Sequence, residues 1–578
     1  MDSSENIVKE FKEHSISEFF KKNRQMLGYS SMIKSLVTVV HEYVTNSLDA
    51  CEDAEILPNI SVKLNRTGDN RYIVIISDNG PGIPKQIIGK ALAMILAGTK
   101  FHRNVQQRGQ QGIGAAGCTL FSQTTTGKPI RAISGLENGK AFSCSIGIDT
   151  MHNKPIINDV IDLKDIPRGL TIEGEFAMVK YDTSDHSVLE YLKRTALSNP
   201  HAQIVFIDPD GKEFSFLRSV DKIPEKPKAA KLHPLGLSVN DLLEEAHSSK
   251  EDMISTFLSS NFSRFSQGKV NELKELLPNI DISKKPKELQ WNESEMIIDA
   301  FKKMKWISPE TAHIIPIGHA QIELTLKNIL NPEFMHVIER KPKVFKGGFP
   351  FIVEAAIAYG GSAGKQLEEG YTGNILRFAN RVPLLFDSGN CAITEAVRSI
   401  QWKRYNIDMD MQPVSVFVNI SSVHIPYSGV GKESVSQEEE IIEEIKLAVM
   451  DAARGLQHFI HNKEKLSMYA NKYKTIMRYT GQLSKDLASL TGKKPDEIRS
   501  TLEKIVAKHY SLESSVNDNK TQSATEDNNV LRQFFQACFV FRLAFCQLMR
   551  QGPLIVGRYI SLLFCICLHT CLVFLYYV

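Results

Sequence analysis

One helical stretch near the N-terminus carries three polar side chains in a row on an otherwise apolar helix. Residues 39–50 read VVHEYVTNSLDA, and Glu42, Asn46 and Asp49 recur at i, i+4 and i+7 on one face. The opposite face carries the apolar residues Leu36, Val39, Val40, Tyr43 and Val44. A carboxylate or an amide that is buried without a partner is costly. The helix is therefore expected to bury its apolar face in a core, while its polar face looks into a pocket or into water.

Helical and strand patterns alternate through residues 1–225. The helical segment at 31–54 precedes several short apolar segments with the composition of strands. The expected strands are 60–64, 72–77, 142–146, 171–176 and 203–206. This order predicts an α+β fold, with a sheet that carries helices on one side.

The chain of 578 residues is long enough for three or four domains at ~150 residues each. A proline- and lysine-rich stretch at 221–236 is expected to mark a boundary, and strands are expected again at 313–326, 349–361 and 414–422. A helix expected from residue 437 to about 483 would be ~70 Å long. The predicted domains are 1–228 (α+β), 229–310 (helical), 311–485 (α+β with the long helix), 486–527 (helical or polar linker) and 528–578 (apolar tail).

Overall charge and cysteine usage narrow the class of protein. A net charge of +3 is too small to bind nucleic acid by itself, so such binding would need local basic patches. Four of the nine cysteines, scattered through the first 528 residues without a CxxC pair, predict a reducing compartment with neither a zinc site nor a disulfide framework. The polar N-terminus lacks the apolar segment of a signal peptide, so we expect a cytoplasmic protein.

The C-terminal tail differs in composition from the rest of the chain. No Asp, Glu or Lys follows Asp527, and the last twenty residues, 559–578, carry no formal charge. Such a segment is long enough to span a bilayer. The abrupt change also fits a shifted reading frame or a strain-specific extension, which we favour, so a membrane is not expected as a partner.

Three further segments carry the residue types of a nucleotide site. RYIVIISDNGPGIP (71–84) is a strand that runs into Asp78 and a Gly-Pro-Gly turn, and RGLTIEGEF (168–176) is a strand that carries Thr171. AGTKFHRNVQQRGQQGIGAAG (97–117) is a glycine-rich loop that leads into a helix. Each pattern alone is common. Together with the polar helix, and in this order, they resemble the ATP site of the GHKL superfamily.

The resemblance implies a role for each residue. Glu42 would orient and polarise the attacking water as general base, and Asn46 would offer its amide oxygen to Mg²⁺. Asp78 would accept a hydrogen bond from the adenine amino group of ATP, with support from Thr171. The lid would contribute Thr99 and Lys100. The phosphates would lie against backbone N–H groups at a helix N-terminus. That cradle comprises Gly109, Gln110, Gln111, Gly112, Ile113, Gly114, Ala115 and Ala116.

A distant loop narrows the family. HIPYSGVGKESV (424–435) resembles the loop of the DNA topoisomerase VI B subunit whose lysine reaches the ATP γ-phosphate, which here is Lys432. RFANRVPLLFD and WKRY (402–405) also resemble that family, particularly its archaeal members, and the likeness covers residues 5–510. The helical segment resembles its helix-two-turns-helix module. The expected DNA contacts are Lys284, Lys285, Lys287, Lys403 and Arg404, while Trp402 and Tyr405 fit a core equally well.

This family implies a multidomain α+β protein with a GHKL (Bergerat) ATPase sandwich, a helix-two-turns-helix insert and an α/β transducer domain with a long C-terminal helix. It also implies an A2B2 heterotetramer in which ATP makes two B subunits dimerise, the topoisomerase VI A subunit cleaves double-stranded DNA, and strand passage relaxes supercoils at the nucleoid. Three alternatives remain: a GHKL ATPase of the chaperone or mismatch-repair type, a membrane-tethered sensor histidine kinase, and a non-enzymatic clamp that uses ATP as a structural ligand. Only about 30 residues precede the Glu42 helix, which leaves little room for a kinase dimerisation helix.

Overall fold

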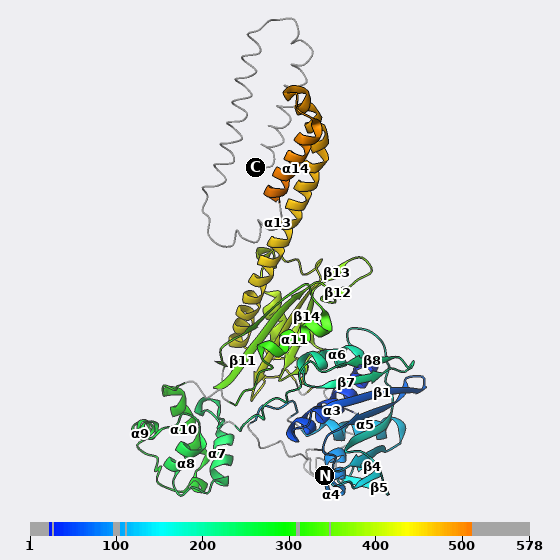
Figure 1. The fold of residues 1–578 in the computed structure, drawn as a ribbon. Coiled ribbons are helices and arrows are strands. Elements are labelled where there is room, and N and C mark those ends of the chain that lie inside the picture. The colour runs from blue at the N-terminus through cyan, green and yellow to red at the C-terminus, as the bar shows by residue number, and fades with distance from the viewer. Residues whose placement is uncertain are drawn as a thin grey trace, which may run out of the picture. The chain divides into compact units, whose positions relative to one another are not determined.

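The computed structural model describes residues 22, 24–25, 28–95, 105–109, 112–229, 231–307, 313–345, 348–429 and 431–510. The chain divides into two compact units, Met1–Ile460 and His461–Val578. The first unit contains two large sheets and a group of helices (Figure 1). Thr99, Lys100, Gln110, Gln111 and the apolar tail lie outside the described residues.

The first sheet has eight strands in the order β5-β4-β3-β6-β2-β1-β7-β8. Its strands are β1 (Asn59–Gly68), β2 (Arg71–Asp78), β3 (Ile130–Gly135), β4 (Ala141–Asp149), β5 (Lys154–Leu163), β6 (Gly169–Ala177), β7 (Gln203–Ile207) and β8 (Glu213–Phe216). All five strands expected here are present, with slightly longer bounds. The sequence pattern does not predict β3, β5 and β8. On β5 most side chains are exposed, so the strand lacks the alternating pattern that marks a half-buried strand.

Four helices pack with this sheet: α3 (Met32–Asp53), α4 (Lys85–Ala93), α5 (Gly114–Thr126) and α6 (Val188–Ser198). Helix α3 begins after Ser31, whose hydroxyl caps it by accepting a hydrogen bond from the Lys34 N–H at 3.3 Å. Its five predicted apolar residues are all buried in the core of this sheet. The predicted orientation of α3 is therefore confirmed.

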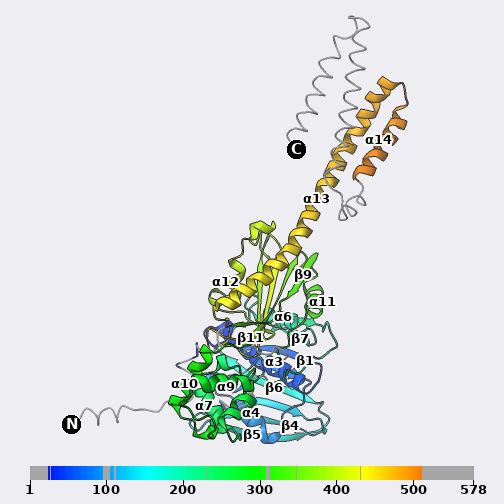
Figure 2. The same cartoon turned by 90° about the vertical axis from the view of Figure 1, so that its left-hand side faces the viewer.

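A second group of helices has its own hydrophobic core (Figures 1 and 2). It contains α7 (Val239–Ser248), α8 (Ile254–Asn261), α9 (Gln267–Leu276) and α10 (Trp291–Lys303), with 3-10 turns at Pro234–Gly236 and Pro286–Glu288. The expectation of a helical segment between the two α+β segments is confirmed.

The second sheet has the order β10-β11-β16-β14-β15, with β9 paired to β11. Its strands are β9 (Phe334–Glu339), β10 (Lys343–Phe345), β11 (Phe349–Tyr359), β14 (Asn374–Ala379), β15 (Val382–Pro383) and β16 (Val414–Ser422); β12 (Lys365–Gln366) and β13 (Tyr371–Thr372) form a separate hairpin. Helices α11 (His319–Leu330) and α12 (Ala392–Arg398) belong to the same region, together with a 3-10 turn at Trp402–Tyr405. Leu385, just after β15, is buried in the core of the first sheet.

The prediction of a strand at 313–326 is wrong, because most of that segment forms α11. The alternation of Ile322, Leu324 and Leu326 imitates a half-buried strand. In the structure Ile322 and Leu326 are buried together with Leu330, at helical spacing, while Leu324 is 45% exposed. Gly318, at φ +98°, turns the chain into this helix.

The long helix is present as α13 (Glu439–Thr491), whose 53 residues correspond to ~80 Å. Helix α13 continues past residue 485, where the sequence analysis places a domain boundary, and α14 (Pro495–Tyr510) follows Gly492 at φ +68°. Among the described residues, no helix is both long enough and apolar enough to cross a bilayer.

Candidate functional site

A cavity of about 570 Å³ lies beside α3, in the first unit. The first sheet and its helices contribute most of its wall, through α3, the turn after β2, α4, the start of α5 and β6. The remaining wall comes from two loops of the second sheet region, at 383–386 and 431–433. The cavity is therefore built by segments nearly 400 residues apart in the chain.

The polar row of α3 divides between two functions. Glu42 and Asn46 line the cavity, and the Asn46 side chain is exposed there. Asp49 instead forms an ion pair with Arg108, at 2.7 Å. Two of the three polar residues therefore face the cavity, while the third anchors part of its wall.

Glu42 lies directly against the first residue of α5. A Cβ added to Gly114 would overlap the Glu42 carboxylate, so glycine at this position allows the close approach. The N-terminus of α5 offers backbone N–H groups without helical partners. The described members of the predicted cradle all line the cavity: Gly109, Gly112, Ile113, Gly114, Ala115 and Ala116.

Asp78, at the end of β2, is held by three donors. Its Oδ2 accepts from the Ser47 hydroxyl at 2.7 Å, and its Oδ1 accepts from the backbone N–H groups of Gly80 at 2.9 Å and Leu170 at 3.2 Å. Burial raises the pKa of this carboxyl, although these three hydrogen bonds oppose the shift. The carboxylate is thus oriented at the cavity wall.

Thr171 is not among the residues that line the cavity. Its hydroxyl donates to the Ser77 hydroxyl at 2.9 Å, across the β2–β6 pairing. Ser47, which the sequence analysis did not select, is the side chain that touches Asp78. Ser47 directly follows Asn46 on α3, one position away from the predicted row. This adjacency is the only feature of the sequence that points to a role for Ser47 at the site.

The Lys432 loop reaches the same cavity from the second sheet region. Lys432 lines the cavity, with its backbone at φ +52°. The neighbouring Glu433 forms an ion pair with Lys34 of α3, at 2.5 Å, and the Ser434 hydroxyl donates to Asp387 at 2.7 Å. The loop that carries Lys432 is therefore fastened, at the two residues that follow it, to α3 and to Asp387.

His41 also lines the cavity, next to Glu42. Burial lowers the pKa of this imidazole; Glu42 opposes the shift and the Lys432 ammonium adds to it. The lowered pKa favours the neutral imidazole, whose ring makes an edge-type contact with Tyr191, with the centroids 5.5 Å apart.

The candidate DNA-binding residues lie elsewhere. Lys284 forms an ion pair with Glu293 at 2.6 Å, and Glu293 also caps the start of α10. Lys285, Lys287, Lys403 and Arg404 are exposed. Trp402 and Tyr405, which flank that last basic pair in the sequence, pack against the core of the second sheet. The aromatic residues of WKRY are therefore core residues, while its basic residues face solvent.

Comparison with known proteins covers both halves of this site. A family described as "Histidine kinase-, DNA gyrase B-, and HSP90-like ATPase" matches residues 32–149, and one described as "Topoisomerase VI B subunit, transducer" matches residues 309–472. The segment that contains the second sheet is hereafter called the transducer.

Curated relatives match over most of the chain. A protein of Methanothermobacter thermautotrophicus, named as the B subunit of a type 2 DNA topoisomerase 6, is 45% identical over 499 residues, which cover 86% of this chain and 95% of the relative. A protein of the same name from Pyrococcus horikoshii is 42% identical over 560 residues, covering 89% and 98% respectively. The family expected from the sequence is confirmed. The chain belongs to the family of type 2 DNA topoisomerase 6 B subunits and is an ATP-binding subunit with a GHKL fold.

Proposed function

We propose that this chain is the ATP-driven clamp of a DNA strand-passage enzyme. Two copies would dimerise when ATP binds, and two copies of a separate A subunit would cleave double-stranded DNA. The observation that carries this proposal is the composite cavity, in which Glu42 and Asn46 on α3 face Lys432 of the transducer. A ligand held by both walls favours one arrangement of the two segments over others, which is what a nucleotide-gated clamp needs.

The residues at the cavity fit the parts of ATP. Asp78 would accept a hydrogen bond from the adenine amino group, in an orientation set by Ser47. Thr171 would contribute indirectly, through its bond to Ser77 on the neighbouring strand. The glycine-rich start of α5 would hold the phosphates on its backbone N–H groups. Thr99, Lys100, Gln110 and Gln111 remain part of the proposal on the basis of the sequence resemblance.

Asn46 fits a Mg²⁺ ion that accompanies the nucleotide. Its amide is exposed in the cavity, and protein-bound Mg²⁺ commonly takes only one or two protein ligands beside phosphates and water. The described residues contain no cluster of three His, Cys, Asp or Glu side chains that could hold a metal by themselves. When bound, the ion would neutralise phosphate charge. Glu42 would orient and deprotonate the attacking water, and Lys432 would contact the γ-phosphate.

DNA would bind away from the cavity. Lys285 and Lys287 beside α10, together with Lys403 and Arg404 of the transducer, present exposed cations that could contact phosphates, whereas Lys284 is engaged by Glu293. Contacts of this kind give salt-dependent binding without sequence preference. A chromosomal substrate implies that the enzyme works at the nucleoid, in the cytoplasm.

Supercoil relaxation tests the proposed function. The purified chain should relax negatively supercoiled plasmid only when the A subunit from the same organism and Mg·ATP are both present. Omission of that partner, or of ATP, provides the control. ATP hydrolysis with no relaxation at any ratio of the two proteins would favour a GHKL ATPase of the chaperone or mismatch-repair type instead.

The ion pair between Lys34 and Glu433 leads to a charge-swap prediction. The Lys34→Glu and Glu433→Lys variants each place like charges side by side, so ATP-dependent dimerisation should need about fivefold more ATP, which corresponds to ~1 kcal/mol. The Lys34→Glu/Glu433→Lys double variant should recover most of this loss, as a double-mutant cycle measures. Lys63→Glu, an exposed charge reversal on β1, serves as the control. Additive losses in the double variant would show that the pair does not position the Lys432 loop.

A further inference from the structure

A short segment behind the cavity connects it to the transducer by a route separate from Lys432. The segment, Val105–Gly109, places Arg108 and Gly109 at the cavity wall. Gln106 is not among the residues that line the cavity, and its side chain makes two hydrogen bonds with one residue of the transducer. Its Nε2 donates to the Ile315 carbonyl at 3.0 Å, and its Oε1 accepts from the Ile315 N–H at 2.6 Å.

Arg108 fixes this segment to α3. Its guanidinium is buried and forms ion pairs with Asp49 at 2.7 Å and with Glu52 at 2.6 Å, and it donates to the Asn199 side chain at 2.6 Å. Burial alone would raise the pKa of Glu52, but Arg108 and His201 hold it well below its ordinary value. A buried, paired guanidinium is costly to displace. The segment is therefore held firmly to the helix that carries Glu42 and Asn46.

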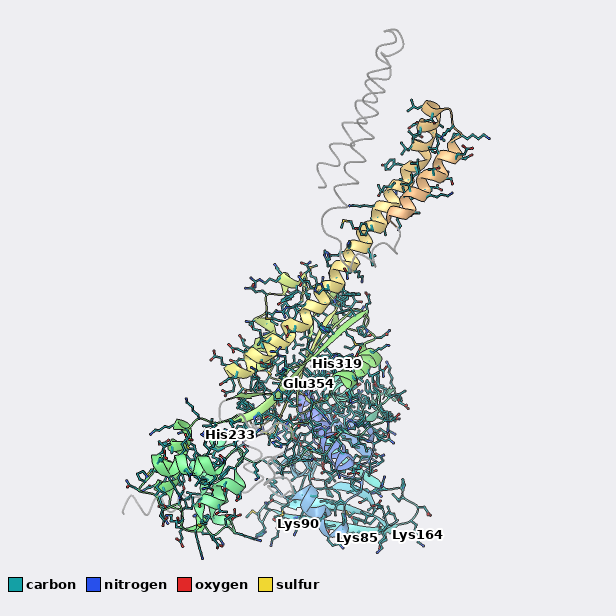
Figure 3. The ribbon with its side chains drawn as sticks, turned by 60° about the vertical axis from the view of Figure 1, so that its left-hand side comes forward. Lys85, Lys90, Lys164, His233, His319 and Glu354 are labelled. Atoms are coloured by element: carbon teal, nitrogen blue, oxygen red, sulfur yellow. The ribbon has the colours of Figure 1, made fainter. Side chains whose placement is uncertain are left out.

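On the transducer side, Gln106 bonds to Ile315, and the residues that follow Ile315 are held by a buried carboxylate. Glu354 of β11 accepts from the N–H groups of Ile317 at 3.0 Å and Gly318 at 2.7 Å, immediately before α11 begins at His319 (Figure 3). Asn419 of β16 also donates to Glu354, at 2.8 Å. Residues 315–318 are thus fastened to the centre of the second sheet at one end and to Gln106 at the other.

A second contact reinforces the first. The Asn380 side chain donates to the Gln107 carbonyl at 3.2 Å and to the Ser422 carbonyl of β16 at 2.8 Å, and its oxygen accepts from the Ser422 N–H at 2.9 Å. Both contacts end on β11 or β16, which are neighbours in the second sheet. A displacement of the Val105–Gly109 segment would therefore act on the middle of that sheet.

We propose that Gln106 is a positioning residue that reports nucleotide occupancy to residues 315–318 of the transducer, in parallel with Lys432. This inference rests on the proposed nucleotide site. A nucleotide that contacts both Gly109 and α3 would restrain the Val105–Gly109 segment together with the helix that holds it, and the paired Gln106 amide would then restrain Ile315. An amide that bonds both the N–H and the carbonyl of a single residue tolerates little rotation. The position of Ile315 is therefore coupled to the position of the Val105–Gly109 segment.

Hydrogen exchange on the full chain provides the test. With a non-hydrolysable ATP analogue and Mg²⁺, backbone amides in residues 313–318 of the wild type should exchange roughly fivefold more slowly than without nucleotide, the factor that ~1 kcal/mol gives. In Gln106→Ala this nucleotide-dependent difference should vanish, while the affinity for the analogue, measured by calorimetry, changes less than about twofold.

Gln107→Ala is the matched control. It makes the same substitution at the next position, where the side-chain oxygen has no hydrogen-bond partner among the described residues, and it leaves the backbone contact to Asn380 in place. This variant should keep the fivefold difference. Melting temperatures without nucleotide should show that both variants are folded.

The possible outcomes separate this inference from the proposed function. If Gln106→Ala speeds exchange equally with and without nucleotide, so that the ratio persists, Gln106 is only structural and the inference is wrong. The inference is also wrong if the wild type binds the analogue but shows no change at 313–318. If the wild type does not bind the analogue at all, the proposed nucleotide site fails as well.

Discussion

Replacement of Glu42 by alanine is expected to leave a protein that binds Mg·ATP and dimerises but hydrolyses ATP ~10²–10⁴-fold more slowly, the usual contribution of a positioned general base. The carboxylate lines the cavity and lies against Gly114 at the start of α5, where the phosphates are proposed to bind. Single-turnover hydrolysis together with an analogue-binding measurement separates the two effects. Undiminished hydrolysis would remove Glu42 from the role of base.

Glu42→Gln is the closer control for this experiment. Glutamine keeps the shape that packs against Gly114 but does not accept a proton from water, so it should reproduce the loss of turnover. Alanine leaves a gap at the same place. If Glu42→Ala is slow and Glu42→Gln is fast, the side chain contributes by packing alone.

Lys432→Ala is expected to uncouple nucleotide binding from closure. The loss of one charge-assisted contact, ~1.5–3 kcal/mol, should raise the ATP concentration needed for half-maximal dimerisation by about 10- to 150-fold. Nucleotide affinity of the monomer should change far less, because the cavity wall from α3 and α5 is untouched. Dimerisation measured by analytical ultracentrifugation against ATP concentration provides the readout.

Two substitutions at the same position sharpen that result. Lys432→Met removes the charge and keeps the aliphatic stem, whereas Lys432→Arg keeps the charge. All three variants retain a side chain at φ +52°, so backbone strain is matched. The methionine variant should need as much additional ATP for dimerisation as the alanine variant, whereas the arginine variant should largely keep the wild-type behaviour. Normal ATP-dependent dimerisation of Lys432→Ala would contradict the assignment.

The parts of the site that could be predicted are those with a local pattern. The row on α3 is visible because helical periodicity places Glu42 and Asn46 on one face, and Asp78 because a strand runs into a glycine turn. Lys432 has no such pattern, and only the family resemblance links it to a cavity almost 400 residues upstream. The structure places it at that cavity.

The contacts around Gln106 and Arg108 could not be predicted. Gln106 bonds to Ile315 across 209 positions, and Arg108 to Asn199 across 91, and no periodicity connects such pairs. Likewise, α11 was mistaken for a strand because six residues of alternating polarity fit both periods. Leu330, which lies beyond the expected strand at 313–326, is buried in the same cluster as Ile322 and Leu326, and this i, i+4, i+8 spacing fits a helix.

Leu385 belongs by sequence to the transducer but is buried in the hydrophobic core of the first sheet, so the transducer completes part of that core. A fragment that ends after residue 228 would keep the core of the first sheet but lose Leu385, which covers part of it. The apolar surface exposed in this way would promote aggregation. Heating the intact chain should then melt both regions in a single calorimetric peak. The thermal stability of each region therefore depends on the presence of the other.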